Sequence, residues 1–205
     1  MNHALWMAAF GLALSACTPL ESKPTKAIAP VPKDGELAMP ANYQSWPVFM
    51  QGIQKSAAKQ IRDIYVNTPG TQAKAGGTFP NGTVFVMEIY TAKLNADQTP
   101  YLDGNGKMVK DKLSKVFLMA KGENWGASAP AALKNGDWIY TAYEGSGAKG
   151  GADASSCRAC HLPLADKDFV FHYDAYFKQR AAASKTVPFA QLGHNEILAA
   201  AHLNY

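Results

Sequence analysis

The sequence predicts an α+β fold, in which helices flank an antiparallel β-sheet. Two observations support this prediction. Short runs of alternating apolar and polar residues are separated by turn dipeptides at Asn81-Gly82, Asp103-Gly104 and Asn135-Gly136, and this combination is typical of strands joined by turns. Strand–helix–strand units, which would build a parallel sheet, do not occur between these runs.

The composition fits one globular domain. The chain has 205 residues, of which 47% are hydrophobic and 18% are charged, as in ordinary folded domains. The formal net charge is +4. A charge this small gives no reason to expect nucleic acid as a partner, although it mildly favours acidic redox partners.

Residues 1–17 are predicted to be an export signal. An apolar run from Leu5 to Leu14 has the length of a signal peptide and is too short to span a membrane. It leads into Ser15-Ala16-Cys17, which resembles the lipobox of bacterial lipoproteins. The sequence therefore predicts a lipidated Cys17 and a periplasmic protein anchored to a membrane by this lipid. Cleavage at a nearby Ala-x-Ala-like site, giving a soluble periplasmic protein, is the alternative.

Residues 18–36 are rich in proline and lysine and are predicted to be a flexible linker. The domain proper is predicted at residues 37–205. Its first element is expected to be a helix capped by Asn42 and kinked at Pro47, because apolar residues recur at helical spacing. These residues are Tyr43, Trp46, Met50 and Ile53.

Alternating patterns then predict four strands. They cover residues 61–67, 83–90, 116–121 and 137–144. Because side chains alternate between the faces of a strand, Arg62 shares a face with Ile64, and Met87 shares a face with Phe85.

The remaining segments are predicted to be loop and helix. Residues 145–150 match the Gly-x-Gly-x-x-Gly pattern of dinucleotide sites, but no strand–helix unit surrounds them, so we expect a loop over residues 145–153. An amphipathic helix with an aromatic stripe in the core is predicted after residue 168. Its stripe consists of Phe169, His172, Tyr173, Tyr176 and Phe177. A last helix is expected over residues 189–201.

The strongest chemical signal is Cys157-Arg158-Ala159-Cys160-His161. Two cysteines three apart, followed directly by a histidine, are the signature of covalently attached c-type haem. On one turn of helix, Cys157 and Cys160 share a face and reach both vinyl groups of one porphyrin edge, while His161 gives its nitrogen to iron. A zinc site needs a second ligand pair and a thioredoxin-like site a βαβ frame, and the sequence offers neither. Haem c is thus predicted near the C-terminal third.

Several short motifs follow one another in a set order along residues 35–180. They are Gly35-Glu36-Leu37, Pro40, Asn42-Tyr43 and Trp46; then Ile61-Arg62-Asp63-Ile64-Tyr65-Val66, Asn81-Gly82-Thr83-Val84 and Asn124-Trp125; and finally the haem motif and Asp168-Phe169-Val170-Phe171. In this order they resemble cytochrome P-460 and its relatives, the cytochromes c-prime-beta. The resemblance implies an antiparallel sheet with a few helices, usually in a homodimer. It also implies a five-coordinate haem whose free face is open to small nitrogen-containing ligands.

Met87 is the main departure from the family. Cytochrome P-460 bonds a lysine to the porphyrin, and the matching position, directly after Val86, is a methionine. Because a thioether cannot form that link, the resemblance gives no support to the hydroxylamine oxidation that depends on it. Met87 is left with three roles: packing in the distal wall, ligating iron in a His/Met cytochrome, or standing beside an open iron site.

Other candidate site residues have a structural alternative each. Arg62 matches an arginine of the family and is a candidate to reach the pocket or a haem propionate; the alternative is a solvated arginine. Asp153, beside Ala152, is a candidate proton relay or an exposed loop residue. Three histidines are conceivable iron ligands but are expected to be structural or exposed, namely His172, His194 and His202.

The sequence thus predicts an exported monohaem c-type cytochrome that binds NO or related nitrogen oxides at an open distal site. Its expected partners are a periplasmic redox protein and a second copy of the chain. The first alternative is an electron-transfer cytochrome with His161/Met87 ligation, and the second is an enzyme that oxidises hydroxylamine. The third, a non-haem redox or zinc protein, would hold no covalent haem.

Overall fold

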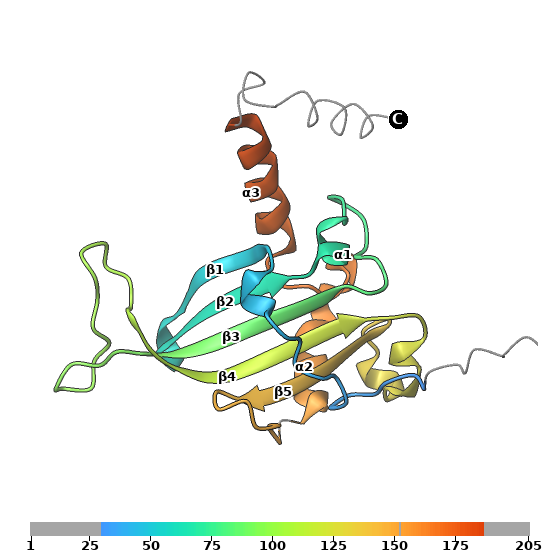
Figure 1. Cartoon of the computed structure of the whole chain (residues 1–205), viewed down its shortest axis with the longest axis horizontal. Coiled ribbons are helices and arrows are strands. Elements are labelled where there is room, and N and C mark those ends of the chain that lie inside the picture. Colours follow the sequence, from blue (N-terminus) through green and yellow to red (C-terminus); the bar gives the residue numbers. More distant parts are fainter. Residues whose placement is uncertain (1–29, 152, 187–205) are drawn as a thin grey trace, which may run out of the picture. The chain divides into compact units, whose positions relative to one another are not determined.

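A computed structural model describes residues 30–151 and 153–186. The described part contains a five-stranded antiparallel sheet in which each strand pairs with the next along the chain (Figure 1). Its strands are β1 (Val48–Lys55), β2 (Gln60–Val66), β3 (Val84–Ala92), β4 (Lys110–Lys121) and β5 (Trp138–Glu144). Together with its helices, this sheet confirms the predicted α+β class.

Eight helical elements accompany the sheet in the described residues. The α-helices are α1 (Thr68–Thr71), α2 (Ala154–His161) and α3 (Tyr173–Thr186). The 3₁₀ helices are η1 (Tyr43–Ser45), η2 (Ser56–Ala58), η3 (Trp125–Ser128), η4 (Ala131–Leu133) and η5 (Leu162–Lys167). No helix in the described ranges is long and apolar enough to cross a membrane.

The helix predicted from Asn42 onward is wrong. Between Asn42 and Pro47 the chain forms a single 3₁₀ turn, η1, and it then continues as the edge strand β1. The pairing of β1 with β2 shifts register on both sides of Met50, and Gly52 adopts a φ of 67°, as bulged strands allow. The bulge replaces the two-residue period of a regular strand, so Met50 and Ile53 both pack against the same core. Their spacing therefore resembled a helix.

The four predicted strands are confirmed; three differ by one or two residues at their ends, whereas β4 begins six residues earlier than predicted, at Lys110. The connection from β2 to β3 is longer than a tight hairpin, because it contains α1 before the turn at Gly82. Asn67 caps α1 by accepting a hydrogen bond from the Gly70 amide at 3.2 Å. Between β3 and β4 the chain forms a long arm (Figure 1), whose predicted turn begins at Asp103, a residue that accepts the Asn105 amide at 2.9 Å.

The two faces of the sheet are covered by different segments. Aromatic residues of α3 join the first core cluster, on the face that also carries Phe49, Phe85 and Trp138. On the other face, Tyr43 and its neighbours before β1 cover β3, β4 and β5. The alternation predicted for β3 is thus confirmed: Phe85 belongs to the first cluster and Val86 to the second.

The aromatic helix begins later than predicted. Asp168, Phe169 and His172 have φ values of 51°, 61° and 60°, which a right-handed helix excludes, so α3 starts at Tyr173. Tyr173 and Tyr176 are each 4% exposed, as expected for the core stripe. The glycine-rich segment before α2 is a loop where it is described. The predicted features at Cys17, Ala152 and residues 189–201, with His194 and His202, lie outside the described residues.

Candidate functional site

A cavity of about 460 Å³ lies between the sheet and α2, a volume within the usual range of ligand sites. The sheet lines it mainly with apolar side chains, among them Phe49, Ile64, Phe85 and Met87. The opposite wall is formed by α2 and by residues 170–172. The lining includes all three side chains of the Cys-x-x-Cys-His motif.

The start of α2 at Ala154 determines which of its side chains face the cavity, and the two cysteines are among them. Asp153 caps the helix by accepting the Ser155 amide at 2.9 Å, and Cys157 and Cys160 then share one face. Neither cysteine forms a disulfide within the described residues; Cys157 is half-buried and Cys160 is exposed. Burial raises the pKa of Cys157 above its usual value.

His161 is held in one orientation. Its Nδ1 lies 2.6 Å from the Phe169 carbonyl oxygen. Because a carbonyl can only accept, Nδ1 is the donor and Nε2 keeps its lone pair for a metal. Burial lowers the pKa of His161, which also favours the neutral ring. Phe171 packs edge-on against the imidazole, with 4.9 Å between ring centroids.

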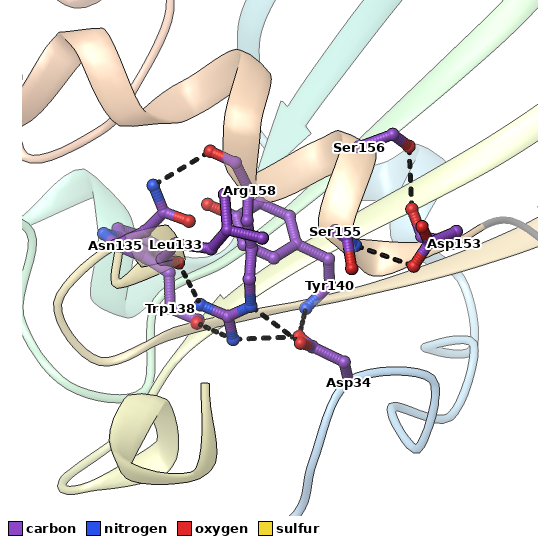
Figure 2. A network of polar contacts seen from close by, with 9 residues as sticks. All are labelled: Asp34, Leu133, Asn135, Trp138, Tyr140, Asp153, Ser155, Ser156 and Arg158. Atoms are coloured by element: carbon purple, nitrogen blue, oxygen red, sulfur yellow. Dashed lines mark hydrogen bonds and ion pairs between the residues drawn. The ribbon is translucent and has the colours of Figure 1, made fainter. Parts of the chain in front are cut away.

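Arg158, inside the motif, was not predicted to matter, yet it ties α2 to the sheet (Figure 2). Arg158 is 1% exposed. Its Nε donates to Asp34 at 2.7 Å, and its Nη2 donates to the Trp138 carbonyl at 3.0 Å. Asp34 also accepts the Tyr140 amide of β5 at 2.9 Å. A charged residue between two cysteines was a possible signal in the sequence, but nothing there pairs it with Asp34.

These contacts also bear on where the domain starts. Asp34 and Gly35 lie in the segment predicted as linker, but Gly35 donates a backbone hydrogen bond to Tyr140 at 2.7 Å. Leu37, the predicted first residue of the domain, donates a hydrogen bond from its amide to Thr141 Oγ1 at 3.2 Å. Ordered contacts therefore begin before Leu37.

Basic side chains gather on the lining of the same cavity. Lys55, Arg62 and His172 belong to it. Burial lowers the pKa of Arg62, and its buried Nε has no hydrogen-bond partner among the described residues. The pKa of His172 is lowered by burial and, secondarily, by Lys55 and Arg62. An anionic group in the cavity would satisfy these donors.

The remaining candidates separate into two groups. Met87 lines the cavity from β3 and packs partly buried against the core. Asp153, considered as a proton relay, is exposed and does not belong to the lining. Its contacts are those of a helix cap. The structure thus brings together Arg62, Met87 and the motif, and it leaves Asp153 outside.

These residues fit a haem. The apolar cavity matches the porphyrin ring, and the two cysteines on one helical face match its vinyl edge. The imidazole, whose Nε2 keeps its lone pair, matches the iron. The unpaired Arg62 Nε matches its carboxylates. Fold and site therefore define a cytochrome built on an antiparallel sheet.

The comparison with protein families agrees. The family model of Cytochrome P460 matches residues 40–172. The chain belongs to the cytochrome P460 family, and its cofactor is accordingly haem. The family resemblance drawn from the sequence motifs is confirmed. A search of curated proteins returns no match.

Proposed function

We propose that this protein is a periplasmic monohaem c-type cytochrome that binds NO or a related nitrogen oxide at an open distal iron site. In this proposal Cys157 and Cys160 hold the haem by thioether bonds and His161 is the proximal ligand. The bound haem supplies an iron with one free coordination position and one-electron chemistry. The observation that carries the proposal is that one cavity is lined both by His161 and by apolar side chains of the sheet.

The apolar sheet residues that line the cavity favour a small uncharged ligand. Phe49, Phe85 and Met87 offer no proton donor and no charge, so they exclude water and stabilise no anion. The charged side chains of the lining are Lys55 and Arg62, with His172 as a further titratable group. We assign Arg62 to a haem propionate, which leaves the apolar part of the cavity to the distal ligand.

One observation favours a second candidate. Met87 lines the same cavity as His161, and thioether ligation would fill the sixth position of iron and suit electron transfer. Oxidation of hydroxylamine has less support, because Met87 cannot provide the lysine link on which that activity depends in the family.

The remaining parts of the proposal concern location and partners. We place the protein at a membrane through a lipid on Cys17, as a homodimer that exchanges electrons with a periplasmic redox protein. A single acyl chain binds membranes only reversibly, so firm anchoring requires the several chains of a bacterial lipoprotein.

Optical spectra of the ferric, ferrous and ferrous–CO protein test the proposal, together with those of the Met87→Leu variant. We expect an open site: CO and NO bind the ferrous form, and Met87→Leu leaves its coordination unchanged. Refusal of CO by the wild type, combined with CO binding by Met87→Leu, would establish the electron-transfer alternative instead.

Covalent attachment is tested separately by haem staining after denaturation in SDS. The wild type should retain its haem, and Cys157→Ser/Cys160→Ser should lose it. Loss of haem from the wild type would contradict thioether attachment and point to a non-haem or non-covalent site. Turnover of hydroxylamine with an artificial acceptor would restore the enzymatic alternative.

A further inference from the structure

The segment after the haem motif has an unusual backbone. Asp168, Phe169 and His172 are non-glycine residues with φ values of 51° to 61°. Such left-handed positions are disfavoured for side chains other than those of Asn and Asp. A conformation of this kind persists when surrounding contacts hold it in place.

Asp168 provides those contacts. Its side chain is 7% exposed and forms an ion pair with Lys121 of β4, whose Nζ donates to both carboxylate oxygens at 2.9 Å. It also accepts the Phe79 amide at 2.8 Å. Lys121 is itself mostly buried, with 12% of its side chain exposed. Asp168 therefore fixes the segment at two independent points, Lys121 of β4 and the Phe79 amide in the connection before β3.

This anchor determines where the next carbonyl points. Phe169 follows Asp168 directly, its amide donates to the Leu164 carbonyl at 2.7 Å, and its own carbonyl accepts from His161 Nδ1 at 2.6 Å. Asp168 and Lys121 do not belong to the cavity lining. Their structural link to the site runs through this backbone.

The hydrogen bond on Nδ1 matters for iron. A partner that accepts the Nδ1 proton orients the imidazole and makes Nε2 a stronger donor. Stronger donation stabilises ferric over ferrous iron and lowers the reduction potential, since axial ligation and outer hydrogen bonds set that potential.

We propose that Asp168 and Lys121 are positioning residues that tune the haem iron by holding the Phe169 carbonyl on His161. The proposal rests on the proposed function in one respect, because it requires His161 to ligate iron. It assigns the buried ion pair an electronic effect at a site that neither residue touches.

The test is the reduction potential of holoprotein carrying Asp168→Asn or Lys121→Met. Asparagine tolerates the left-handed backbone and keeps an acceptor for the Phe79 amide, so this variant removes the charge alone. We expect both variants to shift the redox equilibrium toward ferrous iron by about tenfold, equivalent to a rise of about 59 mV for one electron. In five-coordinate ferrous protein, the iron–histidine stretching frequency should fall.

Asp174→Asn is the matched control. Asp174 pairs with Lys167 at 3.1 Å, but its side chain is 73% exposed and makes no contact with the Phe169 carbonyl. The reduction potential of the Asp174→Asn variant should equal that of the wild type. The proposal is overturned if Asp168→Asn and Lys121→Met lose thermal stability while their potentials stay at the wild-type value. A wild type without His161-ligated haem would instead be a failure of the proposed function, which staining and spectra detect first.

Discussion

His172 shows how a single residue acquires a property from its surroundings. It stands in a left-handed conformation at the start of α3 and lines the cavity. Burial and the nearby charges of Lys55 and Arg62 lower its pKa. At neutral pH it is therefore uncharged, and it leaves the positive charge of this part of the lining to the other two side chains.

Substitution of His172 should make stability less dependent on pH. The pKa of His172 in the unfolded chain is about 6.5, and in the folded protein it is lower. The unfolded chain thus binds more protons than the folded protein in mild acid. The contribution of His172 to the free energy of unfolding is therefore fully present above the unfolded pKa, and it is lost as pH falls from the unfolded pKa toward the folded one. His172→Asn, which suits the backbone, should reduce the slope of unfolding free energy against pH by up to about 1.4 kcal/mol per pH unit.

Urea unfolding at pH values from about 7.5 to 5.5 measures this slope around the unfolded pKa of histidine. Both proteins titrate the same carboxylates, so their difference isolates His172. Parallel curves for the wild type and the variant would rule out the assigned pKa shift.

Helix α2 shows how an element is positioned by contacts that its own sequence does not display. Asp153 starts the helix, and the side chain of Arg158 passes into the protein to meet Asp34. Two further contacts join Arg158 to the segment before β5 and to β5 itself: its carbonyl accepts from Asn135, and its Nη2 donates to the Trp138 carbonyl. The haem-binding face of α2 is thereby directed at the cavity.

Removal of Asp34 should destabilise this arrangement. Asp34→Ala leaves the guanidinium of Arg158, whose side chain is 2% exposed, without its carboxylate. Breaking a fully buried pair costs about 3–5 kcal/mol. Because 26% of the Asp34 side chain is exposed, we expect a loss of about 2–4 kcal/mol in the free energy of unfolding.

Denaturant unfolding of the holoprotein measures that loss. Asp174→Asn serves again as the comparison, since exposed ion pairs contribute under about 1 kcal/mol. Equal losses of unfolding free energy in Asp34→Ala and Asp174→Asn would show that the Asp34–Arg158 pair stabilises the fold no more than an exposed ion pair does.

The whole molecule separates two environments across one sheet. One face carries the haem cavity and the aromatic side chains of α3. The other face carries Glu88, which is 2% exposed and accepts hydrogen bonds from Tyr43 at 2.9 Å and Tyr90 at 2.8 Å. Burial, followed by the hydrogen bond to Glu88, raises the pKa of both tyrosines. The proposed haem site thus lies on one side of the sheet.

Location in the cell is a property of the whole chain and rests on Cys17. If Cys17 is acylated, Cys17→Ser should move the cytochrome from the membrane to the soluble periplasmic fraction without changing its haem spectrum. Fractionation followed by haem staining measures the distribution. An unchanged distribution would contradict the lipid anchor and leave cleavage by an ordinary signal peptidase.

Much of the fold could be predicted because turns and alternation are local signals. Asn81-Gly82 and Asn135-Gly136 marked the boundaries of strands, and alternation placed Met87 on the face of Phe85 and Arg62 on the face of Ile64, where all four line the cavity. The bulge around Gly52 could not be predicted, because it depends on pairing with β2 and on Asp63, whose carboxylate accepts the Gly52 amide at 2.9 Å. The start of α3 depends likewise on contacts made by Asp168.

By itself, the sequence determined the cofactor class and the family, and it predicts the residues that meet the haem, because the spacing of Cys157, Cys160 and His161 is the one that haem attachment requires. The tertiary structure alone decided how they are held. Asp34 meets Arg158, Lys121 meets Asp168, and the Phe169 carbonyl meets His161. The two ion pairs join residues far apart in the chain, and the bond to His161 depends on a backbone that one of them holds. Such contacts exist only once the sheet has brought the segments together.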